Sequence, residues 1–312
     1  MSLMKFNSEL EFKKISLEMK PTIDRYFFEF GEGSCQHSFV SSYCLCNKYD
    51  DHYFEKDDVL YINRNGLSTD EYKVYLFPMC DRNDNNKLKE AINNIICDAH
   101  SENKKVKFFT TTKKCKEIVE NLFGNTFIIE DVRDLYEYMY DIEKISTLSG
   151  SLYQSKRNII NKLCKTFGDR LSIRELCKTD NVILSDFYRK WYDVHYKALK
   201  SLIENEVKEF NLIIDNYDRL NLYGIGVFVD DEMIGFNIGT RVNCETYDGM
   251  IQKGNVEYDG IYELLNRETA KRWINDFKYM NFEEDLGLAG LRNAKEMYHP
   301  EFMIEKFILT EA

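Results

Sequence analysis

Residues 281–300 read Asn-Phe-Glu-Glu-Asp-Leu-Gly-Leu-Ala-Gly-Leu-Arg-Asn-Ala-Lys-Glu-Met-Tyr-His-Pro. Apolar residues recur in this stretch at the spacing of one helical face: Leu288, Leu291, Ala294 and Tyr298. That periodicity predicts a helix over 283–297. At about 100° per residue, Asp285, Arg292 and Lys295 are expected within roughly a quarter-turn of one another on another face of this helix.

Two glycines interrupt the same stretch. Gly287 and Gly290 would each cost a helix interior about 1 kcal/mol relative to alanine. Their presence predicts that another backbone or a ligand approaches closely. The acidic residues at 283–285 have a simpler explanation, because carboxylates at a helix start complement the helix dipole.

Upstream of this stretch, strands and helices alternate. The strands are expected at 171–176, 223–229, 233–240, 245–251 and, after the stretch, 302–309; the helices are expected at 183–198, 202–217 and 259–277. Asp230-Asp231-Glu232 is typical of a tight hairpin turn. The core order is strand, hairpin, strand, helix, strand, helix, strand. It resembles the order of the acetyltransferase (GNAT) fold, in which a splayed mixed sheet binds an acyl donor at its centre.

The first half of the chain has a similar order of elements. The strands are expected at 53–62 (around a turn at 56–58), 72–79, 106–109, 126–130 and 135–140; the helices are expected at 34–47, 83–102 and 112–123. Strands followed by alternating strands and helices indicate α/β or α+β layering. We therefore expect a duplicated fold, with one domain over 1–145 and a second, carrying the active cleft, over 146–312.

Length and composition agree with two domains. The chain has 312 residues, 44% of them hydrophobic and 30% charged, with a net charge of −11. So acidic a chain is not a general binder of phosphate backbones, and any contact with nucleic acid or anionic lipid must come from a local patch. No signal-peptide region or transmembrane segment is expected, so we predict a cytoplasmic location. The nine cysteines include no C-x-x-C pair, which favours reduced thiols and no metal site.

A local basic patch occurs at 151–175. It carries six basic residues, Lys156, Arg157, Lys162, Lys165, Arg170 and Arg174, against two acidic ones, Asp169 and Glu175. At the start of a helix, such a patch suits a phosphate or carboxylate, because the helix N-terminus adds partial positive charge. The alternative is a solvated amphipathic helix that balances acidic neighbours.

The junction at 257–262 is the expected strand-to-helix turn. In acyl-CoA transferases this turn has the pattern Gln/Arg-x-x-Gly-x-Gly/Ala, and its backbone N–H groups cradle the pyrophosphate. Here the turn reads Glu-Tyr-Asp-Gly-Ile-Tyr, and only the central Gly260 matches. Coenzyme A and a donor bound in another way both stay open, and Gly260 also fits a plain turn.

Three segments together resemble the C-terminal catalytic domain of the phosphatidylglycerol lysyltransferase family. They are Gly150-x-x-x-Gln154-x-Lys156-Arg157-Asn158-x-Ile160-Asn161, then Gly260-x-Tyr262-x-x-x-Asn266, then the block at 281–300. The resemblance implies two tandem GNAT-like domains. It also implies transfer of an aminoacyl group from aminoacyl-tRNA, as in the related Fem-type peptidoglycan transferases.

On this resemblance we expect an acyltransferase that uses acyl-CoA or aminoacyl-tRNA and holds no tightly bound cofactor. The acceptor would be an amine or hydroxyl of a small molecule or a lipid headgroup. Asp285 or Glu283 would act as base or hold a cationic acceptor, while Arg292 and Lys295 would bind donor phosphate or stabilise the oxyanion.

The donor or substrate would also be held by a second set of residues: Lys156, Arg157, Asn158, Gly260, Tyr262 and Asn266. The basic patch would contact a tRNA end, a lipid headgroup or a phosphate of coenzyme A. The alternative is an inactive GNAT-like module that binds a small anionic or amino-acid ligand. The sequence leaves the oligomeric state open.

Overall fold

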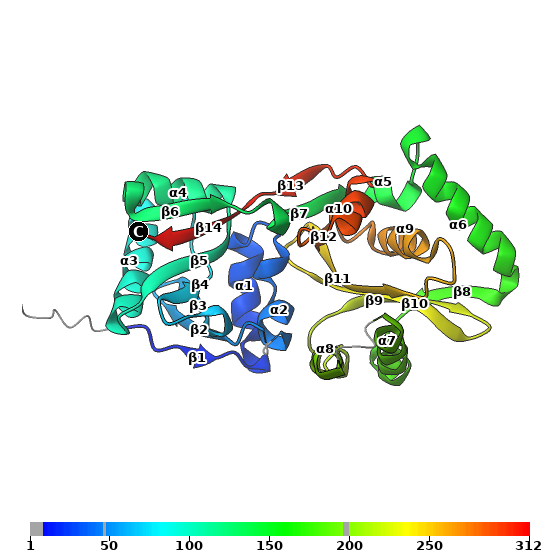
Figure 1. Ribbon diagram of the computed structural model, residues 1–312, viewed down its shortest axis with the longest axis horizontal. Helices are drawn as coiled ribbons and strands as arrows, with labels where there is room; N and C mark the ends of the chain where they lie inside the picture. Colours follow the sequence, from blue (N-terminus) through cyan, green and yellow to red (C-terminus); the bar gives the residue numbers. More distant parts are fainter. Residues whose placement is uncertain (1–8, 46–47, 196–199) are drawn as a thin grey trace, which may run out of the picture. The chain divides into compact units, whose positions relative to one another are not determined.

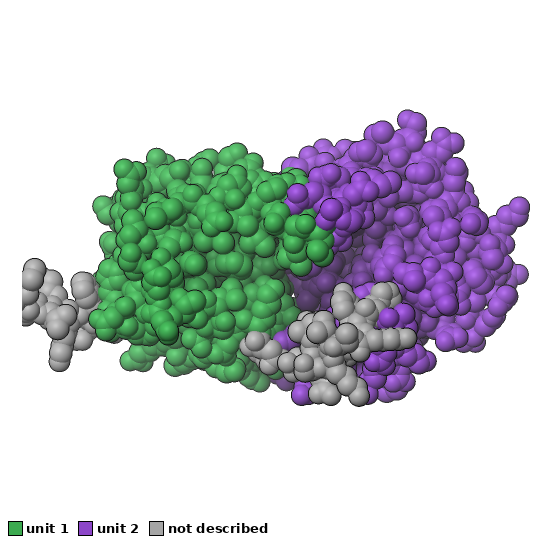
Figure 2. Space-filling view, in the orientation of Figure 1, with its two compact units in different colours: residues 1–137, 284–288, 303–312 green, residues 138–283, 289–302 purple. Residues whose placement is uncertain are grey.

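Figure 1 shows the computed structural model, which describes residues 9–45, 48–195 and 200–312. The chain forms two compact units, coloured in Figure 2. Unit 1 comprises residues 1–137, 284–288 and 303–312, and unit 2 comprises residues 138–283 and 289–302. The division expected after residue 145 assigns the C-terminal end to the second domain, whereas the structure includes that end in unit 1.

The sheet of unit 1 is mixed. Its order is β1 (Lys13–Lys14), β2 (Asp51–Lys56), β3 (Val59–Arg64), β4 (Tyr72–Tyr75), β5 (Lys105–Thr112), β14 (Lys306–Glu311) and β6 (Phe127–Asp131). The helices are α1 (Lys20–Phe30), α2 (Phe39–Cys44), α3 (Asn85–Ser101) and α4 (Lys113–Phe123). β4 and β5 run parallel, while β14 pairs antiparallel with both β5 and β6.

The core of unit 1 lies between this sheet and the helices α3 and α4. The apolar face of α3 carries Leu88, Ile92 and Ile95, which pack against residues of β5 and β14. Phe108 links two further rings, with centroid distances of 5.8 Å to Phe77 and 5.6 Å to Phe127. The helix expected at 83–102 is therefore confirmed by a buried 3.6-residue stripe.

The second sheet is also mixed. Its order is β13 (Phe302–Ile304), β7 (Glu137–Asp141), β12 (Tyr279–Glu284), β11 (Thr246–Gly254), β10 (Glu232–Arg241), β9 (Tyr223–Val229) and β8 (Leu171–Glu175). Its helices are α5 (Ile142–Thr147), α6 (Gln154–Phe167), α7 (Asn181–His195), α8 (Lys200–Asp215), α9 (Ile261–Trp273) and α10 (Ala289–Glu296). In Figure 1, α7 and α8 lie on one face of this sheet and α9 lies on the other.

The hairpin expected around residues 230–232 is confirmed. β9 and β10 pair antiparallel, with Glu232 opposite Val229. Asp230 and Asp231 have φ values of +50° and +65° in the turn between them. Two successive left-handed residues are what a tight hairpin turn requires, and aspartate tolerates that conformation better than most residues.

Three expected elements differ from the structure. The helix expected at 283–297 is wrong at its start, because 283 and 284 end strand β12 and the helix α10 begins only at Ala289. The strand expected at 302–309 is two strands, β13 and β14, in different sheets. The helix expected at 34–47 is a short 3₁₀ turn followed by α2. Residues 46–47 of that expected helix lie outside the described ranges, and so do residues 196–198 of the helix expected at 183–198.

Candidate functional site

A fork between β11 and β12 marks the centre of unit 2. These parallel strands pair over only three positions, the last of which joins Asp248 and Asn281. β11 then continues to Gly254 and stays paired with β10 on its other edge. A bulge between Ile238 and Thr240 of β10 bends the ladder at this point. The burial of β11 changes there too, from fully buried residues at 246–248 to half-buried ones at 249–253.

Buried polar side chains gather where the pairing ends. Asp248 and Asn281 are fully buried. The Asn281 side-chain oxygen accepts a hydrogen bond of 2.7 Å from the backbone N–H of Glu283. On β10, Asn237 accepts a hydrogen bond from the Tyr247 hydroxyl, whose pKa is raised well above its usual value by burial. Such groups keep a defined geometry at low dielectric, as a binding site requires.

Helix α9 is tied to the free arm of the fork. The Gln252 side-chain amide donates a 2.7 Å hydrogen bond to the Asn266 side-chain oxygen. The Tyr262 hydroxyl donates to the Gly254 carbonyl at 3.3 Å. Both sequence-predicted residues of this helix, Asn266 and Tyr262, thus contact β11 beyond the fork. Gln252 was missed by sequence reasoning, since a single glutamine in a strand carries no motif signal.

Gly260 caps the N-terminus of α9 and has a φ of +92°. A Cβ atom there would lie 3.2 Å from both the Cγ1 and the backbone oxygen of Ile159 in α6. The turn is therefore closely covered by α6. An ion pair of 3.2 Å between the exposed side chains of Lys162 and Asp259 joins the same two segments.

Replacing Gly260 by alanine should lower the free energy of unfolding by about 2–3 kcal/mol. Roughly 1 kcal/mol comes from the left-handed conformation, and the rest from displacing the α6 backbone. Ile159→Ala, alone and combined with Gly260→Ala, is the control, because it removes the Cγ1 atom that a Cβ at residue 260 would approach. Urea denaturation of the three variants checks this. If Gly260→Ala costs as much in the Ile159→Ala background as in the wild type, the close approach of the Ile159 side chain is unimportant.

Lys156 is the buried cation of this region. The residue is only 6% exposed, and its Nζ lies 3.6 Å from the ring centroid of Tyr298. No oxygen of the described residues accepts a hydrogen bond from this ammonium. Burial lowers the pKa of Lys156, and the carboxylate of Glu263 on α9 opposes that shift. The Tyr153 hydroxyl fixes the local backbone through a 2.8 Å bond to the Tyr298 carbonyl.

The rest of the basic patch is largely neutralised. Arg157 donates to the backbone carbonyls of Leu148 and Gly150, so it closes the loop before α6. Asn158 is exposed. Three other basic side chains pair with carboxylates: Lys162 with Asp259, Arg170 with Asp230, and Arg174 with Asp180. These contacts favour the interpretation of α6 as an amphipathic helix that balances acidic neighbours.

Glu283 and Lys295 lie close together. The Lys295 Nζ donates a 3.1 Å hydrogen bond to the Glu283 carbonyl and lies 5.7 Å from the ring centroid of Tyr138. Glu283 has a φ of +56°, an unusual conformation for a residue other than glycine. Arg292 lies one turn before Lys295 on α10 and is half-buried.

The periodicity predicted that Asp285 shares a helical face with Arg292 and Lys295, and this prediction is wrong. It precedes α10 and belongs to unit 1, where its buried carboxylate lies 3.2 Å from the Arg133 guanidinium. The same carboxylate accepts a 2.9 Å bond from the Gly287 N–H. Gly287 turns the chain with a φ of +73°, and a Cβ there would lie 2.7 Å from a side-chain oxygen of Asp134. At Gly290, by contrast, a Cβ would meet nothing within 4 Å, so no other backbone of the described residues approaches it, and the approach of a ligand there stays a prediction.

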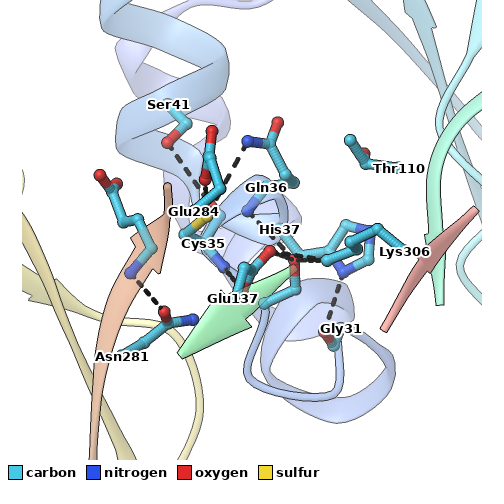
Figure 3. Close-up of polar contacts among 12 residues, drawn as sticks. Gly31, Cys35, Gln36, His37, Ser41, Thr110, Glu137, Asn281, Glu284 and Lys306 are labelled. Carbon is cyan, nitrogen blue, oxygen red and sulfur yellow. Dashed lines mark hydrogen bonds and ion pairs between the residues drawn. The ribbon is translucent and has the colours of Figure 1, made fainter. Parts of the chain in front are cut away.

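Unit 1 contains a buried ionic cluster that the sequence did not predict (Figure 3). The Lys306 Nζ lies 2.6 Å from Glu137 Oε1 and 2.5 Å from the Ser34 hydroxyl. Glu137 also accepts bonds of 2.7 Å from that hydroxyl and 2.9 Å from the Cys35 N–H. Beside it, burial and then the Lys306 charge lower the pKa of His37 to about 3, so His37 is neutral.

Comparison with known proteins identifies the fold and the family. The family model for the phosphatidylglycerol lysyltransferase C-terminal domain matches residues 28–310. A conserved protein of unknown function from Bacteroides thetaiotaomicron is 26% identical, with a TM-score of 0.90 over 97% of this chain and 100% of that one. An uncharacterised protein of Mycoplasmoides gallisepticum is 26% identical over 57% of this chain, and the match spans 58% of the length of that relative.

More distant structures share the fold alone. The C-terminal domain of a putative lysylphosphatidylglycerol synthetase from Agrobacterium fabrum is 10% identical, with a TM-score of 0.65 over 94% of this chain and 93% of that one. FemX is 8% identical, with a TM-score of 0.61 over 96% and 97%. A tandem GNAT protein from the clavulanic acid biosynthesis pathway reaches a TM-score of 0.50 at 9% identity, over 97% and 98%. The mixed-sheet, tandem GNAT-like fold expected from the sequence is thereby confirmed.

Proposed function

Because the chain belongs to the phosphatidylglycerol lysyltransferase C-terminal family, we propose that it transfers an aminoacyl group from aminoacyl-tRNA to an amine or hydroxyl acceptor. The fork in unit 2 supports this proposal. The fork opens at two buried polar residues, Asp248 and Asn281, and Asn266 and the buried ammonium of Lys156 belong to the same unit. Of these groups, the side-chain amides of Asn281 and Asn266 and the ammonium of Lys156 carry N–H donors, which suit the oxyanion of the tetrahedral intermediate of acyl transfer.

The turn before α9 argues against acyl-CoA as the donor. Glu257 and Asp259 are exposed on this turn, and Glu263 lies in the first turn of α9. These carboxylates oppose the binding of a pyrophosphate at the helix N-terminus. Ile159 of α6 also occupies the space next to Gly260. A donor that carries a cationic α-amino group is better matched to these acidic surroundings.

In the proposed reaction, the acceptor attacks the carbonyl carbon of the aminoacyl ester. The bond between that carbon and the ribose oxygen then breaks, and the ribose hydroxyl receives a proton as the new amide or ester forms. Lys156 stabilises the oxyanion, while Glu283 holds a cationic acceptor. Lys295 and Arg292 on α10 face donor phosphate. Each role is a proposal on the geometry of unit 2.

A direct assay tests this function. The protein is incubated with tRNA charged with radiolabelled amino acids, and the acceptors are a panel of primary amines or vesicles of phosphatidylglycerol. We expect label to move to an acceptor only when protein is present.

None of the helices in the described part of the chain has the length and hydropathy needed to cross a bilayer.

A thermal-shift series with acetyl-coenzyme A distinguishes the alternatives. A ligand that binds only the native state raises stability by RT ln(1 + [L]/Kd), so bound acetyl-coenzyme A would raise the melting temperature. Because the proposed donor is aminoacyl-tRNA, we expect no concentration-dependent rise. A rise together with acetyl transfer would replace tRNA by coenzyme A as donor. Saturable binding of an amino acid without transfer to any acceptor would instead favour an inactive binding module.

A further inference from the structure

A cavity of about 480 Å³ in unit 2 is lined by residues other than those at the opening of the fork. Its walls come from α7, from the turn between β9 and β10, and from the turn between β11 and α9. Helix α7 covers the face of the sheet opposite to α9 (Figure 1). The cavity volume is in the range of pockets that bind small organic molecules.

The inner lining is apolar. Phe187 and Trp191 of α7 and the buried Met233 of β10 contribute to it. Three aliphatic side chains that also line the cavity are exposed: Ile183, Val194 and Val256. Exposed aliphatic groups around a concave surface lose contact with water when an apolar ligand binds, which is a favourable contribution.

The polar lining is strongly acidic. Four exposed carboxylates line the cavity, Asp186, Asp231, Glu232 and Glu257, against the single ammonium of Lys190. None of these five side chains forms an ion pair within the residues that the structure describes. The lining therefore has an excess of three negative charges that an incoming cation can neutralise.

Two of these acidic residues, Asp231 and Glu257, lie in turns of defined backbone conformation. Asp231 occupies the hairpin turn in a left-handed conformation, while its neighbour Asp230 is held by Arg170. The Asn255 side-chain oxygen accepts a 3.0 Å bond from the Glu257 N–H and so closes the turn after β11. The acidic rim is thus presented by two tight turns, whose conformations are restricted before any ligand binds.

The aromatic residues of α7 already hold an alkylammonium group. The Nζ of Lys253 lies 4.2 Å from the ring centroid of Trp191 and 5.6 Å from that of Tyr192. The Trp191 indole N–H donates a 3.1 Å bond to the Gly254 carbonyl, which fixes the orientation of the ring. The aromatic rings on α7 therefore favour the binding of cations in the same region as the acidic rim.

We propose that this cavity binds an organic cation, an amine or quaternary ammonium with an apolar body of about one aromatic ring. The ammonium group lies at the rim formed by Asp231, Glu232 and Glu257, and the apolar body packs on Phe187 and Met233. The site lies mainly under α7, on the face of the sheet opposite to α9 (Figure 1), and it shares Glu257 with the turn before α9. Binding of a cation there does not require the proposed transferase activity.

Isothermal titration calorimetry of the full chain with three matched probes tests the site: phenethylamine, 2-phenylethanol and 3-phenylpropionate. We expect the amine to bind at least about ten-fold more tightly than the carboxylate, with the alcohol between them. The triple variant D231N/E232Q/E257Q should weaken amine binding about ten-fold and leave the alcohol unchanged. Since all three residues are exposed, the variant should fold normally.

The control variant is Asp218→Asn, an exposed carboxylate of unit 2 outside the cavity. It should bind phenethylamine as the wild type does. Equal affinity for amine and carboxylate, or an unchanged amine affinity in the triple variant, would overturn the proposal. So would the absence of saturable amine binding to a folded wild-type chain.

Discussion

Replacing Lys306 by alanine will lower the free energy of unfolding by about 3–5 kcal/mol. Lys306 and Glu137 are both fully buried, with 2.6 Å between their charged atoms. Removing the ammonium takes away the cation closest to the Glu137 carboxylate, which keeps the neutral donors of the Ser34 hydroxyl and the Cys35 N–H. A buried charge that loses its counter-ion at low dielectric is among the most destabilising changes a core can suffer.

Urea denaturation followed by circular dichroism measures this loss. Lys113→Ala is the matched control, because Lys113 pairs with Glu305 at 3.2 Å on an exposed surface of the same unit. That substitution should cost less than about 1 kcal/mol. In the double variant Lys306→Met/Glu137→Leu, much of the stability should return, since both charges of the pair are removed together. If Lys306→Ala costs no more than Lys113→Ala, the buried pair does not stabilise unit 1.

The fold was predictable where local chemistry and tertiary structure agree. The hairpin at Asp230 and Asp231 is one such place, because two residues that tolerate positive φ lie between two apolar runs. The segment 283–297 shows the opposite. Leu288 and Leu291 have helical spacing, but strand β12 extends through residue 284, and Gly287 turns the chain before α10 begins. Pairing of β12 with β11 is a long-range interaction that periodicity does not report.

Some features of the candidate site could likewise be predicted from the sequence, and others could not. Motif spacing placed Lys156, Gly260 and Asn266 in one unit, where their helices α6 and α9 make contact. It could not show that Arg157 is bound to two backbone carbonyls or that Asp285 pairs with Arg133. The buried cluster of unit 1 was beyond any local signal, because Lys306 and the Ser34 that it contacts are 272 residues apart.

Replacing Lys156 by methionine will reduce aminoacyl transfer by about 100-fold or more while the chain stays folded. Its ammonium is buried on the ring of Tyr298, with no oxygen of the described residues within hydrogen-bonding distance of it. A buried ammonium in such surroundings destabilises the native state, since desolvation is only partly offset by the ring. Methionine fills a similar volume without charge. We therefore expect the free energy of unfolding to stay within about 1 kcal/mol of the wild-type value, or to rise.

The pH dependence of stability separates this role from a structural one. Burial lowers the pKa of Lys156 in the native state, whereas in the unfolded chain it is about 10.4. Between these two values the unfolded chain binds more protons, so the wild type gains stability as pH rises through this window. The stability advantage of Lys156→Met should therefore be largest near neutral pH and shrink toward pH ~10.4. Lys165→Met, an exposed substitution on the same helix, should change neither transfer nor this difference. If Lys156→Met unfolds the protein, Lys156 holds the structure of α6; if the folded variant keeps full transfer activity, Lys156 is not part of the chemistry.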